Sequence, residues 1–313
     1  MTNPRFAVYG AGGVGGYFAA VLARAGHWLG LIARGRQLDA IRESGLRVES
    51  PKGNFDVRPA KVTDQPADIG PVDSVILAVK AWQVPEAVQA MRPLLGSGTK
   101  VLPLQNGVEA SDQLERTLGR EHVLLGLCRI ISSVSAPGCI RHGGLDPQVA
   151  LGEVDAGPLS PNAAVLVEAL RSAGAKVETP ADMRAALWEK LLFIAAVSGV
   201  GAVARANIGE IRNCEPTRQL LQQVMTEVQT VAASRGVRLA ADIVERTRAF
   251  VETIPASGTA SMQRDIADGK PSELESIIGV VGRFGREAAV ATPAIDYIYA
   301  SLLPQERRAR GTH

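Results

Sequence analysis

The hydrophobic and polar positions follow two different periods along the chain, and the change falls near residue 180. Before it, short and almost entirely apolar runs predict strands covered on both faces. Patterns with apolar residues every three to four positions predict helices between them. The strand runs are 5–9, 29–33, 74–79 and 100–104, and the helical patterns are 14–26 and about 84–95. This alternation predicts an α/β fold with a doubly wound sheet.

Shorter strands are predicted around this framework. The pieces 46–49 and 55–58 flank a turn of Pro, Lys, Gly and Asn, which is typical of a hairpin. Residues 122–152 hold several short strand candidates broken by glycine and proline. All of these precede residue 180, so we expect them to belong to the same α/β half.

From Ala181 onward the chain carries long helical patterns and no convincing strand. Thr179-Pro180-Ala181-Asp182 resembles the start of a helix with proline in its first turn. We therefore place a domain boundary at residue 180, between an α/β domain at 1–180 and an all-helical domain at 181–313. The helical patterns are 181–203, 210–235, 239–253, 271–290 and 293–303.

A glycine-rich loop lies between the first predicted strand and the first predicted helix. It reads Gly10-Ala11-Gly12-Gly13-Val14-Gly15 and satisfies G-x-G-x-x-G. Glycine at position 10 permits the tight turn after the strand. Glycine at position 12 lets a pyrophosphate approach the backbone, and glycine at position 15 lets the helix pack closely on the sheet. The strand, loop, helix and second strand together predict a Rossmann dinucleotide site rather than a structural turn.

The end of the second strand indicates which dinucleotide is bound. NAD-selective sites usually carry Asp or Glu there, to accept a hydrogen bond from the ribose 2′-hydroxyl. This chain has Ala33-Arg34-Gly35-Arg36 instead, with no carboxylate from Leu29 to Leu38. A guanidinium pairs bidentately with a 2′-phosphate, so the pattern predicts NADP(H), held by Arg34 and secondarily by Arg36.

Composition narrows the class of protein. The 313 residues carry a net charge of +2, which is too small to indicate nucleic acid or a membrane surface as a partner. Three widely spaced cysteines are no disulfide framework, and the four histidines lack metal-ligand spacing. The first strand begins within a few residues of Met1, and no apolar run approaches a membrane span, so we expect a cytoplasmic protein.

One basic cluster remains at the C-terminus, formed by Arg307, Arg308 and Arg310. We expect a solvated tail there, with contact to a phosphate or a partner as the alternative.

Further segments, in this order behind the glycine loop, resemble the ketopantoate reductases (2-dehydropantoate 2-reductases). They are Val79-Lys80-Ala81-Trp82-Gln83-Val84, Gln105-Asn106-Gly107-Val108, Leu187-Trp188-Glu189-Lys190, and Ser261-Met262-Gln263-Arg264-Asp265 with Glu273 downstream. The resemblance covers most of the chain. It implies a Rossmann domain followed by an all-α domain, and reduction of a 2-oxo acid by NADPH, such as ketopantoate to pantoate in pantothenate biosynthesis.

The resemblance also implies roles for individual residues. Lys80 and Asn106 are implied as cofactor contacts on the nicotinamide side, beside the glycine-loop residues and Arg34. Lys190 is implied as the proton donor, since an ammonium stabilises and protonates the alkoxide that hydride transfer creates. Glu273 is implied to accept a hydrogen bond from the substrate hydroxyl, and Ser261 to bind its carboxylate. Substrate contacts are thus expected at Ser261, Ser198, Asn106 and Glu273.

The chain departs from the family pattern at several polar positions. Asparagines commonly follow the catalytic lysine at four and eight residues, on the same helix face, where this chain has Ile194 and Ser198. A third asparagine aligns with Ile208, although the neighbouring Asn207 is an alternative, and a fourth aligns with Ile278. We expect the reduction chemistry to be retained and the substrate to be less polar than ketopantoate.

Three interpretations stay open on the sequence. The first is a ketopantoate reductase, and the second a dehydrogenase of the same fold with a different hydroxy acid. The third is a protein that senses NADP(H) without catalysis, against which the retained Lys190 and Glu273 argue. In the first two, a cleft between the domains is expected to hold the substrate. A homodimer remains open, because the apolar helix faces also have to build the second domain's own core.

Overall fold

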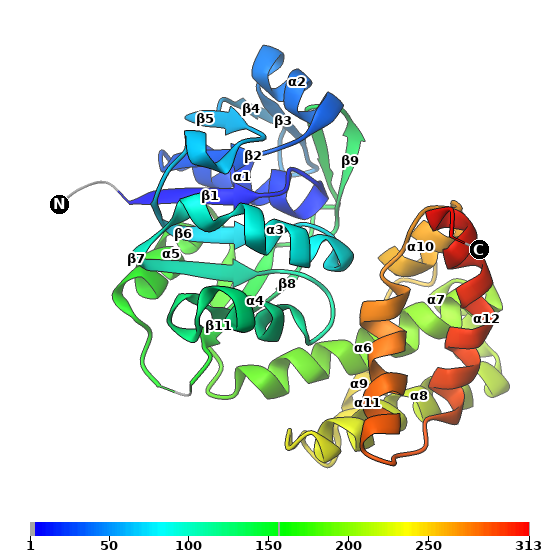
Figure 1. Cartoon of the computed structure of the whole chain (residues 1–313). Coiled ribbons are helices and arrows are strands. Elements are labelled where there is room, and N and C mark those ends of the chain that lie inside the picture. Colours follow the sequence, from blue (N-terminus) through cyan, green and yellow to red (C-terminus); the bar gives the residue numbers. More distant parts are fainter. Residues whose placement is uncertain (1–3, 156, 313) are drawn as a thin grey trace. The chain divides into compact units, whose positions relative to one another are not determined.

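A computed structural model describes residues 4–155 and 157–312. The chain separates into two compact units (Figure 1). The first, here called the α/β unit, comprises Met1–Gln105 and Glu109–Met183. The second, the helical unit, comprises Asn106–Val108 and Arg184–His313. The short segment 106–108 therefore belongs with the helices, although strand residues precede it in the chain.

The centre of the α/β unit is a five-stranded parallel sheet. Its strand order is β5 (Lys61–Thr63), β2 (Trp28–Ile32), β1 (Arg5–Tyr9), β6 (Val72–Leu77) and β7 (Leu95–Pro103). Four of these strands, β1, β2, β6 and β7, were predicted. Their apolar residues are buried, because both faces of the sheet are covered. The strand order reverses between β1 and β6, and open α/β sheets bind ligands at the carboxyl ends of the strands beside such a point.

Two smaller sheets complete the α/β unit. The predicted hairpin forms, with β3 (Leu46–Glu49) antiparallel to β4 (Phe55–Val57). It joins β10 (Cys139–His142) and the edge strand β9 (Ser132–Ala136), and this sheet packs on α1 (Gly13–Arg24). The other sheet has the order β12 (Lys176–Glu178), β11 (Gln148–Glu153) and β8 (Leu124–Arg129). α1 is thereby enclosed between β1 and the hairpin sheet, which buries residues 15–22.

The remaining helices of this unit are α2 (Gly35–Ser44), α3 (Val84–Ala90), α4 (Ala110–Leu118) and α5 (Pro161–Ser172). The helix expected to run to about residue 95 is shorter than predicted. α3 ends at Ala90, and a separate 3₁₀ turn follows over Arg92–Leu94. Pro93 accounts for the break, because it lacks an amide proton and cannot continue the hydrogen bonding of the α-helix.

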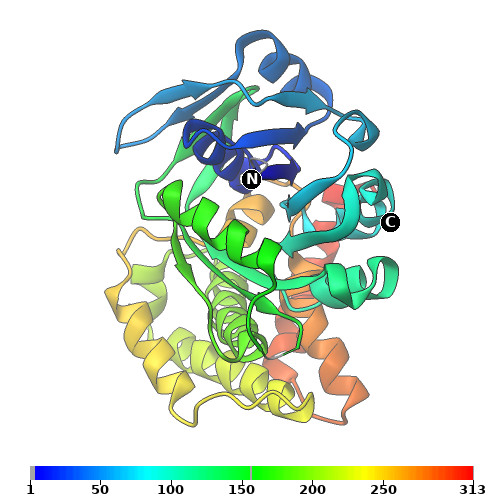
Figure 2. The same ribbon diagram turned by 90° about the vertical axis from the view of Figure 1, so that its left-hand side faces the viewer.

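Among the described residues, the helical unit has no strand. Its helices are α6 (Met183–Ala204, beginning at the end of the α/β unit), α7 (Ile208–Asn213), α8 (Glu215–Ser234), α9 (Ile243–Thr253), α10 (Ser261–Ala267), α11 (Val280–Glu287) and α12 (Pro293–Arg310). In Figure 2 the light-green α6 runs inside this unit, with yellow helices to one side and orange to red helices to the other. The pattern at 210–235 is two helices rather than one, divided at Cys214 with Pro216 in the first turn of α8.

Two sequence expectations about the helical unit were wrong. No apolar segment long enough for a membrane span was expected, but α6 has the length and composition of one, with a mean hydropathy of 1.6. Its most apolar stretch is 72% buried inside the protein, as in a core helix. The expected solvated tail holds for the exposed Arg307 and Arg308 but is wrong for Arg310. α12 continues to Arg310, whose guanidinium bonds to Glu306 and to the Ser272 carbonyl.

Candidate active site

The glycine loop joins β1 to α1 at the carboxyl edge of the parallel sheet. Gly10 has φ +107°, which glycine adopts without strain. A Cβ at Gly15 would overlap the Gly10 carbonyl oxygen, and one at Gly13 would lie 2.6 Å from the Ser132 carbonyl oxygen. Glycine at these positions is therefore required by the fold itself.

Gly12 differs from its neighbours in the loop. A Cβ added there would meet no atom within 4 Å, and its φ of −74° suits any residue. Packing therefore does not require glycine at 12, whereas a pyrophosphate approaching the backbone at the N-terminus of α1 does. The open space in front of Gly12 fits a dinucleotide.

Two polar atoms near the carboxyl edge of the sheet also fit a ligand. Gln105 follows β7, and its side-chain amide donates to the carbonyls of Leu77 and Val79, at 3.0 Å each. Its Oε1 is buried and has no hydrogen-bond partner among the described residues, and the same holds for Oγ of Ser132. Buried polar atoms normally have a partner, so a bound polar group would satisfy both.

Gln37 was not predicted and braces the glycine loop. It lies in the first turn of α2, where its side chain donates to the Ala11 carbonyl at 2.9 Å. Its Oε1 accepts from the Gly138 amide at 3.0 Å. One side chain thus ties the loop to the turn before β10, a pairing over about a hundred residues that no local pattern reveals.

Arg34 lies just beyond the end of β2 and immediately precedes α2, a helix that the sequence pattern did not predict, and it is exposed together with Arg36. Its Nη1 lies 2.7 Å from Oε1 of Glu86, in the first turn of α3. No local pattern in the sequence predicts this partner. Arg34 also borders a cavity of about 510 Å³, whose other lining residues are Asp64, Gln65, Pro66, Ala67, Ala90 and Pro93.

Lys80 follows the end of β6, at the same edge of the sheet. Its backbone amide donates to Oε1 of Gln83 at 3.1 Å, in the turn that leads into α3. Its ammonium lies 5.8 Å from the ring centroid of Trp82, within cation–π range. These contacts hold the segment Lys80–Gln83 in place beside the strand ends.

In the helical unit, Lys190 lies on α6 and is only 8% exposed. Ile194 and Ser198 follow it on the same face at intervals of four residues. Ser198 is 1% exposed, and its hydroxyl donates to the Ile194 carbonyl within the helix. Because this hydroxyl proton is already used, Ser198 is a weak replacement for an asparagine that would donate to substrate.

Asn106 and Glu273 lie 167 positions apart in the sequence and meet in the structure. Nδ2 of Asn106 donates to Oε2 of Glu273 at 2.9 Å, and Glu273 is 6% exposed. Gly107, at φ +104°, lets the backbone approach closely, since a Cβ there would lie 2.6 Å from the Ser276 carbonyl. The Asn-Gly pair thus holds two predicted site residues together. A π-helical turn, Glu275–Gly279, follows directly, and such turns are frequent at functional sites.

The residue before Glu273 is anchored by the C-terminal helix. The buried carboxylate of Glu306 accepts from the Ser272 amide at 3.0 and 3.1 Å and from the Ser272 hydroxyl at 2.6 Å. Arg310 donates to Glu306 at 2.5 Å and to the Ser272 carbonyl at 2.8 Å. α12 therefore fixes the backbone from which the Glu273 side chain extends.

The other candidate substrate residues differ in their surroundings. Ser261 is exposed and is the first residue of α10, which Gln263 ties to the end of α6 through the carbonyls of Gly201 and Ala206. Asn207 caps α7 by accepting from the Glu210 amide at 3.0 Å. Its side-chain oxygen therefore has a structural role, which weakens Asn207 as the replacement for a missing asparagine.

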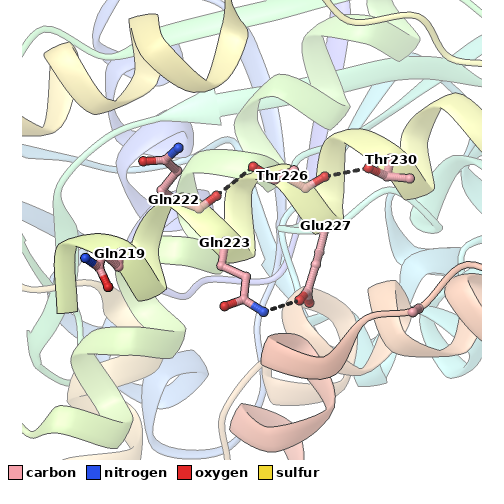
Figure 3. A pocket seen from close by; sticks show the side chains of 7 residues that line it. Gln219, Gln222, Gln223, Thr226, Glu227 and Thr230 are labelled. Carbon is pink, nitrogen blue, oxygen red and sulfur yellow. Dashed lines mark hydrogen bonds between the residues drawn. The ribbon is translucent and has the colours of Figure 1, made fainter. Parts of the chain in front are cut away.

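A second cavity, of about 560 Å³, lies along α8 and contains none of the predicted site residues. Figure 3 shows its polar side chains, with Gln223 bonded to Glu227. The Glu227 carboxylate also accepts from the amides of Ala294 and Ile295, at 2.9 Å each. These contacts cap the N-terminus of α12, so we assign Glu227 a structural role.

Comparison with known proteins shows which family has this architecture. The family description "Ketopantoate reductase PanE/ApbA" matches residues 6–156, and its C-terminal counterpart matches residues 182–306. A 2-dehydropantoate 2-reductase of Mesorhizobium japonicum is 30% identical, with 95% of this chain and 96% of the relative covered. The chain belongs to the ketopantoate reductase family. It is an oxidoreductase of this nicotinamide-dependent family.

Solved structures of ketopantoate reductases share the whole fold. One from Ralstonia eutropha JMP134 has a TM-score of 0.89 and 31% identity, with 98% of this chain and 99% of that chain covered. A D-mandelate dehydrogenase solved with NADH and anilino(oxo)acetate has a TM-score of 0.87 and 22% identity. The match covers 98% of this chain and 99% of that chain. The resemblance stated from the sequence motifs is confirmed.

Proposed function

We propose that this ketopantoate reductase family member reduces a 2-oxo acid to a 2-hydroxy acid with NADPH. The observation that carries the proposal is the contact between Asn106 and Glu273, with the nearly buried Lys190 in the same unit. In the α/β unit, the open space at Gly12 and the position of Arg34 support NADP(H) as the cofactor. Three free cysteines support a reducing compartment, and we propose the cytoplasm.

Each candidate residue has a role in this reaction. NADPH, when bound, supplies the hydride that adds to the carbonyl carbon of the substrate. Negative charge then develops on the carbonyl oxygen, where the Lys190 ammonium stabilises it and donates a proton. Glu273 accepts a hydrogen bond from a hydroxyl of the substrate where it carries one, as ketopantoate does, and Asn106 holds that carboxylate by donating to it. Ser261 is assigned to the substrate carboxylate.

The substrate has two candidates. Ketopantoate is the one favoured by the relatives, which include several 2-dehydropantoate 2-reductases. A less polar 2-oxo acid is favoured by the fully buried Ile278, by Ile194, and by the Ser198 hydroxyl bonded within its own helix. Each hydrogen bond missing from a buried substrate group costs about 1–3 kcal/mol, so two lower the rate or affinity for ketopantoate by roughly 10²–10⁴.

The first experiment measures NADPH oxidation against a panel of 2-oxo acids that includes ketopantoate, aliphatic and aryl compounds, with NADH as the control cofactor. We expect turnover with NADPH and the fastest rate on a compound less polar than ketopantoate. Fast turnover of ketopantoate at a micromolar Michaelis constant would instead assign the biosynthetic reaction. Tight NADPH binding without oxidation by any compound would contradict the proposal.

The role of Lys190 is tested by Lys190→Ala. We expect kcat to fall by about 10²–10⁴, the range for a lost general acid, while the Kd for NADPH stays unchanged. Lys270→Ala is the matched control, because its side chain is 63% exposed in the same unit. Unchanged turnover in Lys190→Ala would remove this residue from the mechanism.

A further inference from the structure

Among the described residues, Arg34 forms an ion pair with an acidic residue of another helix. Glu86 lies in the first turn of α3, and its carboxylate is 2.7 Å from the Arg34 guanidinium. Both side chains are largely exposed, at 54% and 65%, so the pair is open to exchange of partners. Glu86 is thus well placed to influence what Arg34 binds.

The cavity beside this pair has the composition of a nucleoside site. Pro66, Ala67 and Pro93 give it apolar walls. Gln65 adds an amide, Asp64 adds a carboxylate, and Arg34 lies on its border. Ala90, which also lines it, follows Glu86 by one helical turn on α3. A flat base in this cavity would bring its ribose to the end of β2, where Rossmann folds discriminate the 2′-substituent.

We propose that Glu86 is a specificity-determining residue that weakens the preference of this protein for NADPH over NADH. This inference rests on the proposed preference of the protein for NADP(H). Glu86 acts in two ways: it occupies Arg34, and its negative charge repels the 2′-phosphate that has to replace it. NADH carries a neutral 2′-hydroxyl, so its binding escapes both effects.

The test is the binding of each dinucleotide, measured by the fluorescence of the reduced nicotinamide without substrate. Glu86→Gln keeps the size of the side chain and removes its charge. We expect the Kd for NADPH to fall by about two- to fivefold, the effect of a competing exposed ion pair, and the Kd for NADH to change by less than about twofold. The gain should shrink as salt is added, because screening weakens exposed charges. Glu86→Ala should act in the same direction.

Glu168→Gln is the matched control. Glu168 pairs with Arg171 at the same distance of 2.7 Å, also on the surface of the α/β unit. This variant changes the net charge equally and should leave both dissociation constants unchanged. An equal gain in Glu168→Gln, an equal gain for both dinucleotides in Glu86→Gln, or weaker NADPH binding in Glu86→Gln would overturn the inference.

Arg34→Gln separates this inference from the proposed function. If NADP(H) is the cofactor held by Arg34, this variant should bind NADPH at least about tenfold more weakly and leave NADH unaffected. Unchanged NADPH binding in Arg34→Gln would contradict the cofactor assignment. A selective gain of NADPH affinity in Glu86→Gln still supports the role of Glu86 in that case, through direct repulsion of the phosphate.

Discussion

At the scale of single residues, the glycines of the loop after β1 serve different ends although they form one motif. Gly15 faces the Gly10 carbonyl, and Gly13 faces the Ser132 carbonyl, so both are needed for the chain to pack. Gly12 faces open space. The motif therefore contains residues required by folding and one residue, Gly12, that packing does not require and that we propose for the nucleotide. Substitution can separate the two.

Gly12→Ala should leave the free energy of unfolding within about 1 kcal/mol of the original, because the new methyl group meets nothing. It should weaken NADPH binding by at least about tenfold, since the methyl group keeps the pyrophosphate from the backbone. Denaturant unfolding and a binding titration measure the two effects. Gly15→Ala is the contrast, and should destabilise the fold by about 1–3 kcal/mol through overlap with Gly10. Undiminished binding by Gly12→Ala would contradict the assignment of this loop to the nucleotide.

At the scale of elements, the C-terminal helix supports the segment that carries Glu273. Glu306 and Arg310 of α12 bond to the amide, hydroxyl and carbonyl of the buried Ser272. A buried carboxylate with several donors is stable only while its partners remain. The last turn of α12 is therefore structural, whereas the sequence pattern alone suggested a basic tail.

Arg310→Met should lower the free energy of unfolding by about 1–3 kcal/mol, because Glu306 loses a charged partner in a buried site. Arg308→Met provides the control: Arg308 is exposed in the same turn, and its replacement should change stability by no more than about 0.5 kcal/mol. Denaturant unfolding compares the two variants. Equal stabilities would show that the Arg310 contacts do not stabilise the fold.

At the scale of the whole molecule, groups with shifted pKa values make the stability depend on pH. Glu153 pairs with Lys100 at 2.9 Å, and both side chains are largely buried. Burial raises the pKa of Glu153, but the bonds from Lys100 and Ser160 outweigh it and lower the pKa overall. Burial lowers the pKa of His27 in the same unit.

Both shifts predict a loss of stability in acid. A lowered pKa in the folded state adds stability above the unfolded value, about 4.3 for Glu and 6.5 for His. That stability disappears as the pH falls through the folded pKa, so the free energy of unfolding should decline below about pH 6.5 and more steeply below about pH 4.3. Denaturant unfolding at a series of pH values measures this decline in the free energy of unfolding. Glu153→Gln should flatten the lower part of the decline, while Glu168→Gln, at an exposed pair, should not.

Much of the fold follows from local pattern. The apolar runs of β1, β2 and β6, the hairpin β3–β4 and the helical second half are confirmed, because burial on a sheet or a helix face imposes a period that the sequence must carry. Element ends were less well predicted. α3 stops before Pro93, and the pattern at 210–235 divides at Cys214, because backbone restriction by proline overrides apolar periodicity.

The sequence by itself predicted the alternation of strands and helices, the nucleotide loop and the candidate residue Arg34, whereas Lys190 and Glu273 came from the resemblance to a known family. Only the tertiary structure decided what these residues touch. Glu86 reaches Arg34 across 52 positions, Asn106 reaches Glu273 across 167, and Glu306 reaches Ser272 across 34. The reason is physical: periodicity records which side of an element is buried, whereas a hydrogen bond between distant side chains depends on how separate elements pack and leaves no spacing in the chain.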